Sequence, residues 1–525
     1  MPSHTYCACR KRVKKTMNRR DFLKFASIAA GVLAAPQGAR AAIDAPGLKE
    51  GEVFSRDKLL DYARNLAKAP YQAPDATLPS SLQNLDYEQY VSIRFRPDRG
   101  IWSQDHRGFV IEPLHRGFIY AAPVDLFTVE DGRVLIVPYE PAMFDFGKIA
   151  APPPDSKLGF SGFRLKAPID MPNRLDDFAI FQGASYFRAI AKNQVYGAAA
   201  RGLAINTGEA SGEEFPSFRA FWIERPPQNA ENLVVHVLLD SEAATGAFRL
   251  TLHPGEITTI DVETTIFPRA KIEHVGIAPL NSMFLFGSND RKGADDVRVA
   301  VHASSGLQML SGGGEWIWRP LQNPETLQIS AFVDKTPRGF GLLQRGRDPA
   351  DYEDSRHRYE MQPSVWITPK GDWGEGTIQL VEIPTDQEIH DNIIAYWRPK
   401  DALEAGKDYS FAYRTNWCST PPDRPPMTLV RATRIGALGS KRRMFVIDFE
   451  GDLFANADNL NGVTPEITVN PGKLSDVSLT LETERRIGRL SFGLDPSSET
   501  YSEMRAVLVK DGKPVSETWL YRWTP

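Results

Sequence analysis

Residues 233–264 read LVVHVLLDSEAATGAFRLTLHPGEITTIDVET, and this stretch decides the fold class. Apolar and polar residues alternate with a period of two at 233–239, 248–252 and 258–264, as they do in half-buried β-strands. The turn-forming sequence His253-Pro254-Gly255 separates the second segment from the third. We therefore predict consecutive β-strands here.

The same alternation recurs along the chain. It covers residues 117–126, 133–137, 327–333, 377–382 and 392–397. Helical periodicity lies near the beginning, where Ser55 is a candidate N-cap for apolar residues spaced as in a helix over 59–67, and 85–90 predicts a shorter helix. Because strands do not alternate with helices, we predict an all-β fold of packed antiparallel sheets.

A charged segment that contains Pro399 and Gly406, residues 399–406, separates two strand-like regions and predicts a linker. After it, short strand-like runs follow at a spacing typical of an immunoglobulin-like sandwich. These runs are 409–417, 428–433, 444–449, 467–469, 477–482, 489–492, 504–509 and 516–521. We therefore predict a large β-sandwich domain at 43–398 and an immunoglobulin-like β-sandwich at 407–525.

The N-terminal segment has the pattern of an export signal. Residues 17–24 read MNRRDFLK, a weakly apolar run follows at 25–35, and residues 39–41 read ARA, a small-x-small cleavage site. This pattern predicts a twin-arginine signal peptide over 1–42 and a periplasmic protein that is exported folded. The apolar run is shorter than the roughly 20 residues that span a bilayer, so we expect no stable membrane insertion.

Composition excludes several classes of protein. The chain has 525 residues, with 62 Lys and Arg against 66 Asp and Glu, and a formal net charge of −4. It has no basic stripe that would neutralise phosphates, so we expect no nucleic-acid partner. The nine His residues lack the spacing of metal ligands, and no phosphate- or dinucleotide-binding motif occurs. We therefore expect neither a metal nor a cofactor.

Several loops combine glycine, aromatic residues and arginine. Aromatic faces that stack on sugar rings, together with arginines that bind hydroxyls, are what a carbohydrate-binding groove needs. Candidates in these loops are Arg188, Tyr196, Trp316 and Trp318. The alternative is that such rings belong to the core, which is the more frequent role of Trp and Tyr on strands.

Longer motifs in the same loops resemble the periplasmic glucan biosynthesis family, which comprises the OpgG and OpgD proteins. The motifs are FQGASYFRA (181–189), ARGLAI (200–205), EEFP (213–216), GIAPL (276–280), GEWIWRPL (314–321), GFGLLQ (339–344) and EIPT (382–385). The twin-arginine signal resembles that of the D-type members. The resemblance implies a large β-sandwich with a cleft, a C-terminal immunoglobulin-like sandwich, and action on the β-1,2-glucan of osmoregulated periplasmic glucans. Some members are anomer-inverting β-1,2-glucanases.

The resemblance also implies roles for individual residues. The sequence EIHDNI at 388–393 matches the family's acid, so Asp391 is the expected general acid and Glu388 a supporting carboxylate. Two carboxylates three residues apart can keep one of them protonated, although such residues are common in turns. Tyr359 matches a tyrosine near the reacting sugar. The expected hydroxyl ligands are Arg347, Asp348 and Tyr352.

Two departures from the family pattern bear on the reaction. Residues 302–307 read HASSGL where the family usually reads HDSDGL, so Ala303 and Ser305 replace two carboxylates. Residues 434–443 stand where hydrolytic D-type members carry a long insertion. These differences favour transglycosylation, by chain transfer or cyclisation, over hydrolysis.

Three alternatives remain open at this point. The first is an endo-β-1,2-glucanase, and the second is a non-catalytic glucan-binding or scaffold protein. The third is a lectin-like carrier that serves a membrane glucan synthase. The sequence also leaves open whether the protein is a homodimer.

Overall fold

The computed structural model describes residues 48–439, 442–496 and 500–525. The predicted signal peptide, residues 1–42, lies outside the described residues. Strands dominate the described chain, and its α-helices are α2 (Arg56–Leu66) and α3 (Tyr87–Ser92). Both helices were predicted. Ser55 occupies the N-cap of α2 without a side-chain cap bond, and Asp86 forms a capping box with Gln89 at α3. Short 3-10 helices are η1 (Ser80–Leu82), η2 (Pro97–Arg99), η3 (Pro141–Met143), η4 (Pro349–Asp351), η5 (Tyr359–Met361), η6 (Asp452–Phe454), η7 (Ala457–Leu460) and η8 (Thr483–Arg485).

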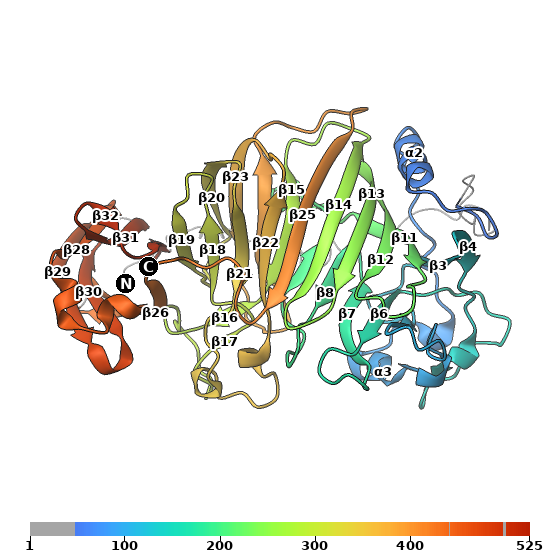
Figure 1. The fold of residues 1–525 in the computed structure, drawn as a ribbon, viewed down its shortest axis with the longest axis horizontal. Coiled ribbons are helices and arrows are strands. Elements are labelled where there is room, and N and C mark those ends of the chain that lie inside the picture. The colour runs from blue at the N-terminus through green and yellow to red at the C-terminus, as the bar shows by residue number, and fades with distance from the viewer. Residues whose placement is uncertain (1–47, 440–441, 497–499) are drawn as a thin grey trace, which may run out of the picture. The chain divides into compact units, whose positions relative to one another are not determined.

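Most strands belong to two sheets, which we call the larger and the smaller sheet (Figure 1). In spatial order, the larger sheet contains β28 (Val463–Asn470), β31 (Ser502–Lys510), β33 (Thr518–Trp523), β19 (Trp316–Pro320), β18 (Gly306–Leu310), β21 (Gly339–Leu343), β22 (Ser364–Lys370), β25 (Tyr409–Cys418), β14 (Thr258–Pro268), β13 (Ala244–His253), β12 (Leu233–Asp240), β11 (Ser217–Glu224), β3 (Asp125–Glu130) and β4 (Arg133–Ile136), with β32 (Lys513–Pro514) paired to β31. The smaller sheet contains β2 (Val110–Leu114), β6 (Gly162–Ala167), β7 (Asp176–Gln182), β8 (Tyr186–Ala189), β9 (Ala199–Arg201), β15 (Val275–Ser282), β24 (Ile393–Pro399), β23 (Glu375–Glu382) and β20 (Gln328–Lys335), with β10 (Ala204–Ile205) paired to β15.

The stretch at 233–264 forms β12, β13 and the beginning of β14, in the middle of the larger sheet. The strands pair antiparallel, with Leu233 opposite Leu252 and Phe248 opposite Thr264. The predicted strands are therefore confirmed, and with them the all-β class.

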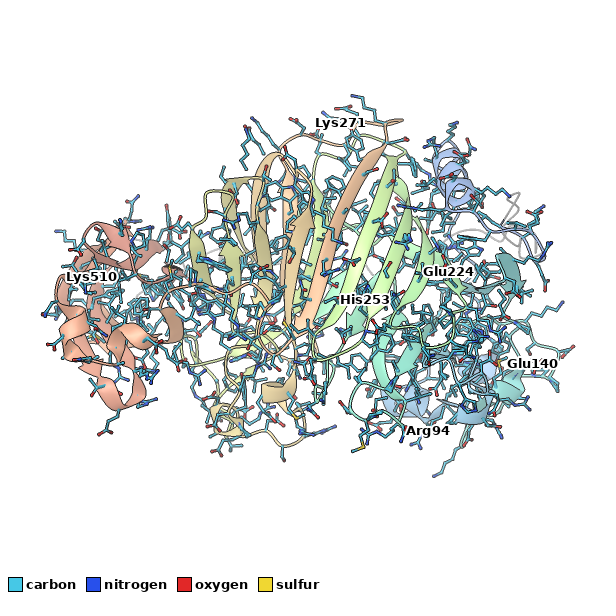
Figure 2. The ribbon with its side chains drawn as sticks, viewed as in Figure 1. Arg94, Glu140, Glu224, His253, Lys271 and Lys510 are labelled. Atoms are coloured by element: carbon cyan, nitrogen blue, oxygen red, sulfur yellow. The ribbon has the colours of Figure 1, made fainter. Side chains whose placement is uncertain are left out.

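The two large sheets share one apolar core. Phe163 of the smaller sheet meets Phe221 of the larger sheet edge to face, with ring centroids 4.9 Å apart, and both rings are buried in this core. Side chains alternate along a strand, so the residues between the core positions lie on the opposite face of the smaller sheet. Arg188, next to the core residue Phe187 on β8, is one of them. Charged side chains such as Lys271 and Glu140 lie exposed at the surface (Figure 2).

A second core lies in the C-terminal part of the chain. A four-stranded sheet of β26 (Leu429–Leu438), β27 (Arg442–Glu450), β30 (Ile487–Asp495) and β29 (Lys473–Glu482) packs against β28, β31 and β33. Phe445 and Phe492 stack there at 5.3 Å and meet Trp519 edge to face. Two small sheets complete the described fold: β1 (Arg94–Phe95) with β5 (Phe144–Asp145), and β16 (Phe284–Phe286) with β17 (Val301–His302).

The structure corrects one predicted strand. Residues 117–126 were expected to form a single strand, yet only the end of this stretch belongs to β3. Gly117 and Tyr120 exchange two backbone hydrogen bonds of 3.2 and 2.8 Å, and Phe118 has a φ of 52°. A tight turn therefore interrupts the apolar run, which leaves Ile119 exposed instead of alternating into a core.

The structure also changes the place of the first strand after the predicted linker. Residues 399–406 connect β24 of the smaller sheet to β25, which pairs with β14 and β22 of the larger sheet. The linker composition at this position therefore marks a crossing between two sheets of one sandwich. β25 does not belong to the C-terminal sandwich, whose separate folding stays a prediction.

Candidate active site

Asp391 is held at the N-terminal end of β24, an inner strand of the smaller sheet, by its neighbour Asn392. The fully buried Asn392 side chain accepts from Phe284 N at 2.8 Å and donates to the carbonyls of Phe284 and Ile383, each at 3.0 Å. These bonds fix Asn392, the residue directly before β24, and with it the adjacent Asp391. The carboxylate of Asp391 is thereby presented next to the face that carries Arg188.

Arg188 and Asp391 form an ion pair. Arg188 Nη2 donates to Asp391 Oδ2 at 2.8 Å, and Arg188 Nε donates to the carbonyl of Gly197 at 3.2 Å. Each of the two charged side chains is 31% exposed. The fold thus brings together two predicted site residues that are far apart in the sequence, and it leaves both accessible.

Glu388 has a different arginine partner. Arg298 Nη1 donates to Glu388 Oε2 at 2.7 Å, and the hydroxyl of Tyr359 donates to the same oxygen at 3.2 Å. Tyr359 begins η5 and is almost fully buried. Since Asp391 and Glu388 each contact their own guanidinium, the mutual repulsion expected from their spacing is opposed by two positive charges.

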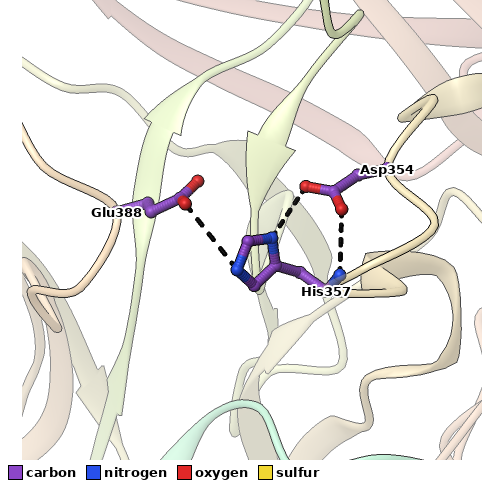
Figure 3. A group of neighbouring side chains, drawn as sticks. All are labelled: Asp354, His357 and Glu388. Carbon is purple, nitrogen blue, oxygen red and sulfur yellow. Dashed lines mark hydrogen bonds and ion pairs between the residues drawn. The ribbon is translucent and has the colours of Figure 1, made fainter. Parts of the chain in front are cut away.

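Two further residues, Asp354 and His357, complete the cluster around Glu388 (Figure 3). His357 Nδ1 lies 2.8 Å from Asp354 Oδ2, and His357 Nε2 lies 3.7 Å from Glu388 Oε1. Arg298 Nη1 also donates to Asp354 Oδ2 at 2.8 Å. Sequence reasoning missed Arg298, Asp354 and His357. For Asp354 and His357 the available signal was their place five and two residues before Tyr359, a predicted site residue.

Electrostatics fixes the charge state of two groups in the cluster. Burial opposes ionisation of Asp354, but hydrogen bonds from the His357 backbone and ring and from Arg298 outweigh it and hold the pKa of this carboxyl well below its usual range. Burial and the negative charge of Glu388 raise the pKa of the Tyr359 phenol. Asp354 is therefore an anion and Tyr359 a neutral hydrogen-bond donor.

The cluster of Asp354, His357 and Glu388 is poorly suited to a metal ion. One ligand atom from each of Asp354, His357 and Glu388 can lie within 4.8 Å of the others. However, the guanidinium of Arg298 already bridges the two carboxylates. A divalent cation would have to displace that positive charge.

The same face of the smaller sheet carries a second polar and aromatic cluster. Arg201 Nη1 donates to Glu213 Oε1 at 2.6 Å. The guanidinium carbon of Arg201 lies 5.2 Å from the centroid of the Tyr186 ring and 5.0 Å from that of Phe215. Tyr186 is close enough to Asp391 for the carboxylate charge to contribute to the raised pKa of its phenol, after the larger effect of burial. The FQGASYFRA, ARGLAI and EEFP motifs thus meet beside Asp391.

The predicted hydroxyl ligands Arg347, Asp348 and Tyr352 bind protein groups. Arg347 donates to the backbone carbonyls of Glu360, Gln362 and Ser419 at 2.9, 2.5 and 2.8 Å. The hydroxyl of the buried Tyr352 donates to the carbonyl of Gly346 at 3.1 Å. Asp348 Oδ1 accepts from the backbone of Ala350 at 2.9 Å and caps η4. These contacts support the loop that carries Tyr359.

The two predicted tryptophans lie in the C-terminal core. Trp316 and Trp318 are buried there, and Trp316 stacks on Trp366 with centroids 5.9 Å apart. Both tryptophans are therefore core residues, as the alternative interpretation of the sequence stated. Tyr196 packs against the core of the two large sheets, and its hydroxyl is buried without a hydrogen-bond partner among the described residues. Burial raises its pKa, and the charges of Asp177, Arg164 and Arg188 also act on it.

The two positions that depart from the family pattern offer no carboxylate. Ala303 packs in the same apolar cluster as Tyr352 and Tyr359. Ser305 Oγ donates to the carbonyl of Leu343 and accepts from the backbone of Arg345, both at 3.1 Å. The Ser305 hydroxyl is therefore engaged in linking strands.

Comparison with known proteins decides the family. The model of the family described as periplasmic glucan biosynthesis protein, MdoG, matches residues 54–523. The chain belongs to this family. The resemblance drawn from the motifs is thereby confirmed, and periplasmic glucan biosynthesis is the process in which the protein takes part.

Curated relatives agree over nearly the full length. The chain is 46% identical over 510 residues to glucans biosynthesis protein G of Rhodopseudomonas palustris strain BisA53, covering 97% of this chain and 100% of that protein. The protein of the same name from Bradyrhizobium diazoefficiens is 44% identical over 511 residues, covering 97% and 100%. That from Vibrio cholerae is 44% identical over 477 residues, covering 90% and 87%. All three are named protein G, so the D-type assignment stays a prediction.

None of the helices in the described part of the chain is both long and apolar enough to cross a bilayer.

Proposed function

We propose that this protein processes linear β-1,2-glucan by an anomer-inverting reaction in which Asp391 is the general acid. The observation that carries the proposal is the half-exposed Arg188–Asp391 pair, which lies beside the aromatic residues contributed by the family motifs. An accessible carboxyl group at the start of β24, next to these aromatic residues, can supply the proton that cleavage of a glycosidic bond requires.

In this reaction Asp391 protonates the leaving glycosidic oxygen while a hydroxyl group attacks the anomeric carbon from the other face. Arg188 Nη2 holds Asp391 Oδ2. The glycosidic oxygen approaches this same carboxyl group. Arg188 then stabilises the carboxylate after the proton has left. Glu388 supports the site through its contacts with Arg298 and Tyr359.

Transfer to a sugar hydroxyl is favoured over hydrolysis. Ala303 is apolar and Ser305 is bonded to the backbone, so neither residue can activate water as a carboxylate would. A sugar hydroxyl that is positioned by its own ring needs less help from the protein than a free water molecule does. The product is then a transferred or cyclised glucan. Release to water, as in an endo-β-1,2-glucanase, is the second outcome.

A non-catalytic glucan-binding protein is the competing class. The observation that favours it is that both carboxylates are held by arginines, as they are in purely structural ion pairs. The loss of carboxylates at positions 303 and 305 then marks a lost activity. Binding to glucan without any change of its length is what this alternative predicts.

The test is to incubate the purified protein with linear β-1,2-glucan and to resolve the products by mass. Transfer gives chains of redistributed length, and cyclisation gives products that weigh one water less than the linear chains. Hydrolysis gives shorter linear chains with new reducing ends. Glucan that binds and is recovered unchanged contradicts the enzyme proposal.

The route of export is part of the same proposal. Residues 17–24 carry the paired arginines that a folded-protein export receptor reads as guanidinium groups. Replacing both Arg19 and Arg20 with lysine keeps the charge, and we expect it to leave the precursor in the cytoplasm. Fractionation of cells that express the double variant tests this, and unchanged periplasmic accumulation contradicts it.

A further inference from the structure

His357 is held in a single tautomer. Its backbone N–H donates to Asp354 Oδ1 at 2.9 Å, and its ring Nδ1 lies 2.8 Å from Asp354 Oδ2. An ionised carboxylate can only accept hydrogen bonds, so Nδ1 carries the proton. In the neutral ring, Nε2 is therefore a proton acceptor.

Asp354 cannot be the proton acceptor itself. Its pKa lies well below the usual range because hydrogen bonds from His357 and Arg298 outweigh the effect of burial. A carboxylate that is so strongly stabilised as an anion is a poor base near neutral pH. Its contribution is to orient the imidazole and to stabilise the imidazolium that forms when Nε2 takes a proton.

The acceptor atom of His357 faces a second acceptor. Nε2 lies 3.7 Å from Glu388 Oε1 (Figure 3), whereas Oε2 of Glu388 already accepts from Arg298 and Tyr359. These two atoms attract each other only when a proton is present on one of them. Protonation of Nε2 therefore converts the contact into an ion pair.

The His357 side chain is also accessible. It is 35% exposed, and its ring stacks on that of Tyr359 with centroids 5.6 Å apart. The charged or titratable groups around it are Asp354, Glu388 and Tyr359, with Arg298 bound to both carboxylates. This exposure leaves room for the hydroxyl of a bound sugar to approach Nε2 of the ring, which Asp354 orients from behind.

We propose that His357 is the proton acceptor of the reaction, an inference that rests on the proposed glucan-processing function. Nε2 of His357 takes the proton of the attacking hydroxyl group. At the same time the oxygen of that hydroxyl group forms the new bond to the anomeric carbon. The glycosidic bond breaks, its electron pair remains on the leaving oxygen, and Asp391 supplies that oxygen with a proton. The step ends with an imidazolium beside Glu388 and a carboxylate beside Arg188. Transfer of one proton from His357 to Asp391 through solvent restores the site.

The test compares the His357→Gln variant with wild type on linear β-1,2-glucan. We expect kcat to fall by roughly 10² to 10⁴, the usual contribution of general base catalysis, while the glucan dissociation constant stays within about twofold. The acid limb of the rate profile against pH should disappear as well, because a glutamine has no proton to gain. A purely structural role would not remove that limb.

The matched control is His253→Gln. His253 ends β13, and its Nε2 lies 3.8 Å from Asp261 Oδ2, so it is a second half-exposed histidine beside a carboxylate. We expect this variant to keep wild-type kcat and the wild-type pH profile. A His357→Ala variant in the presence of added imidazole provides a second measurement, because the free base should restore part of the rate if the ring acts as a base.

The outcomes separate this inference from the proposed function. If Asp391→Asn is inactive and His357→Gln turns over glucan like wild type, the assignment of His357 is overturned and the function stands. Wild-type protein that binds glucan without converting it overturns both. Calorimetric titration with CaCl2, MnCl2 or ZnCl2 completes the test: stoichiometric cation binding that is lost in His357→Gln would make the cluster a metal site and overturn the proposal.

Discussion

Two clusters of this molecule use the same residue types in opposite ways. In the C-terminal core, Arg345 Nη1 and Nη2 donate to the two oxygens of Glu517 at 2.5 and 3.0 Å, and the Arg345 guanidinium lies 3.5 Å from the centroid of the Trp318 ring. Glu517 also accepts from the backbone of Val430 at 2.8 Å and from Gln308 Nε2 at 3.3 Å. The side chain of Glu517 is fully buried.

The cluster around Glu388 in the candidate site also pairs arginine with carboxylates, but its side chains are incompletely buried. Arg298, Glu388 and His357 are 19, 26 and 35% exposed. One nitrogen of His357 faces another acceptor at 3.7 Å, an arrangement that a structural network would avoid. Burial with complete pairing indicates a packing role, whereas exposure with a proton acceptor held in place indicates chemistry.

The largest effect that this comparison predicts is on turnover. Replacing Asp391 with Asn keeps the shape of the side chain and removes the proton donor, so we expect kcat to fall by roughly 10² to 10⁴ while glucan binding and the melting temperature change little. Steady-state kinetics and thermal unfolding measure the two.

The matched control for Asp391 is Asp261→Asn. Asp261 accepts two hydrogen bonds from Arg414, at 2.8 and 2.7 Å, on the larger sheet. This variant removes a carboxylate from an arginine pair that lies outside the candidate site. A loss of turnover equal to that of Asp391→Asn would show that the cause is general disturbance of the fold.

In the C-terminal cluster the large effect should be on stability. Glu517→Gln leaves the largely buried Arg345 without its counter-ion, and breaking one side of a buried pair costs up to about 3 to 5 kcal/mol of unfolding free energy. Turnover per folded molecule should be unchanged, because Glu517 contacts none of the site residues in the described structure. Chemical denaturation followed by an activity assay below the transition checks both. A stable variant with impaired kcat would remove the distinction between the two clusters.

Tyr359→Phe should give a smaller effect within the candidate site. The change removes one hydrogen bond to Glu388 Oε2 and keeps the buried ring. A hydrogen bond to a charged group contributes about 1.5 to 3 kcal/mol to stability, and because its loss frees Glu388 to move, we expect kcat to fall by less than in Asp391→Asn. Tyr352→Phe is the control, because its hydroxyl donates to a backbone carbonyl instead. Equal losses in the two variants would contradict a special role for the Tyr359 hydroxyl.

The sequence predicts much of the fold because local periodicity carries the information. The alternation at 233–264 and the helical spacing at 59–67 reappear in the structure. The same signals cannot say which sheet a strand joins, so β25 was assigned to the wrong sandwich. Sheet membership depends on pairing between strands that are distant in sequence, such as β14 with β25.

The site shows a similar limit. Asp391, Glu388 and Tyr359 follow from resemblance, and the structure brings Glu388 and Tyr359 into contact. Arg298 was missed because nothing in its own segment shows that it reaches Glu388, 90 residues later. Trp316 and Trp318 could not be assigned either, because an aromatic and arginine-rich motif has the same composition in a core as in a binding surface.

The smallest predicted effect distinguishes two aspartates of the same loop, Asp348 and Asp354. Both cap backbone N–H groups: Asp348 Oδ1 accepts from Ala350 at 2.9 Å, and Asp354 Oδ1 accepts from His357 at 2.9 Å. Asp354 uses its other oxygen for the His357 ring and Arg298. Asp348 is exposed at the beginning of η4.

Replacing Asp348 with Ala should therefore cost about 1 kcal/mol of unfolding free energy, as the loss of a cap does, and leave kcat and the glucan dissociation constant unchanged. Asp354→Ala removes both a cap and the anion behind His357, so its kcat should fall as well. Denaturation curves together with glucan titrations measure the difference. If Asp348→Ala weakens glucan binding tenfold with no change in stability, the carboxylate binds sugar hydroxyls as the family resemblance implied, and its role as a cap is secondary.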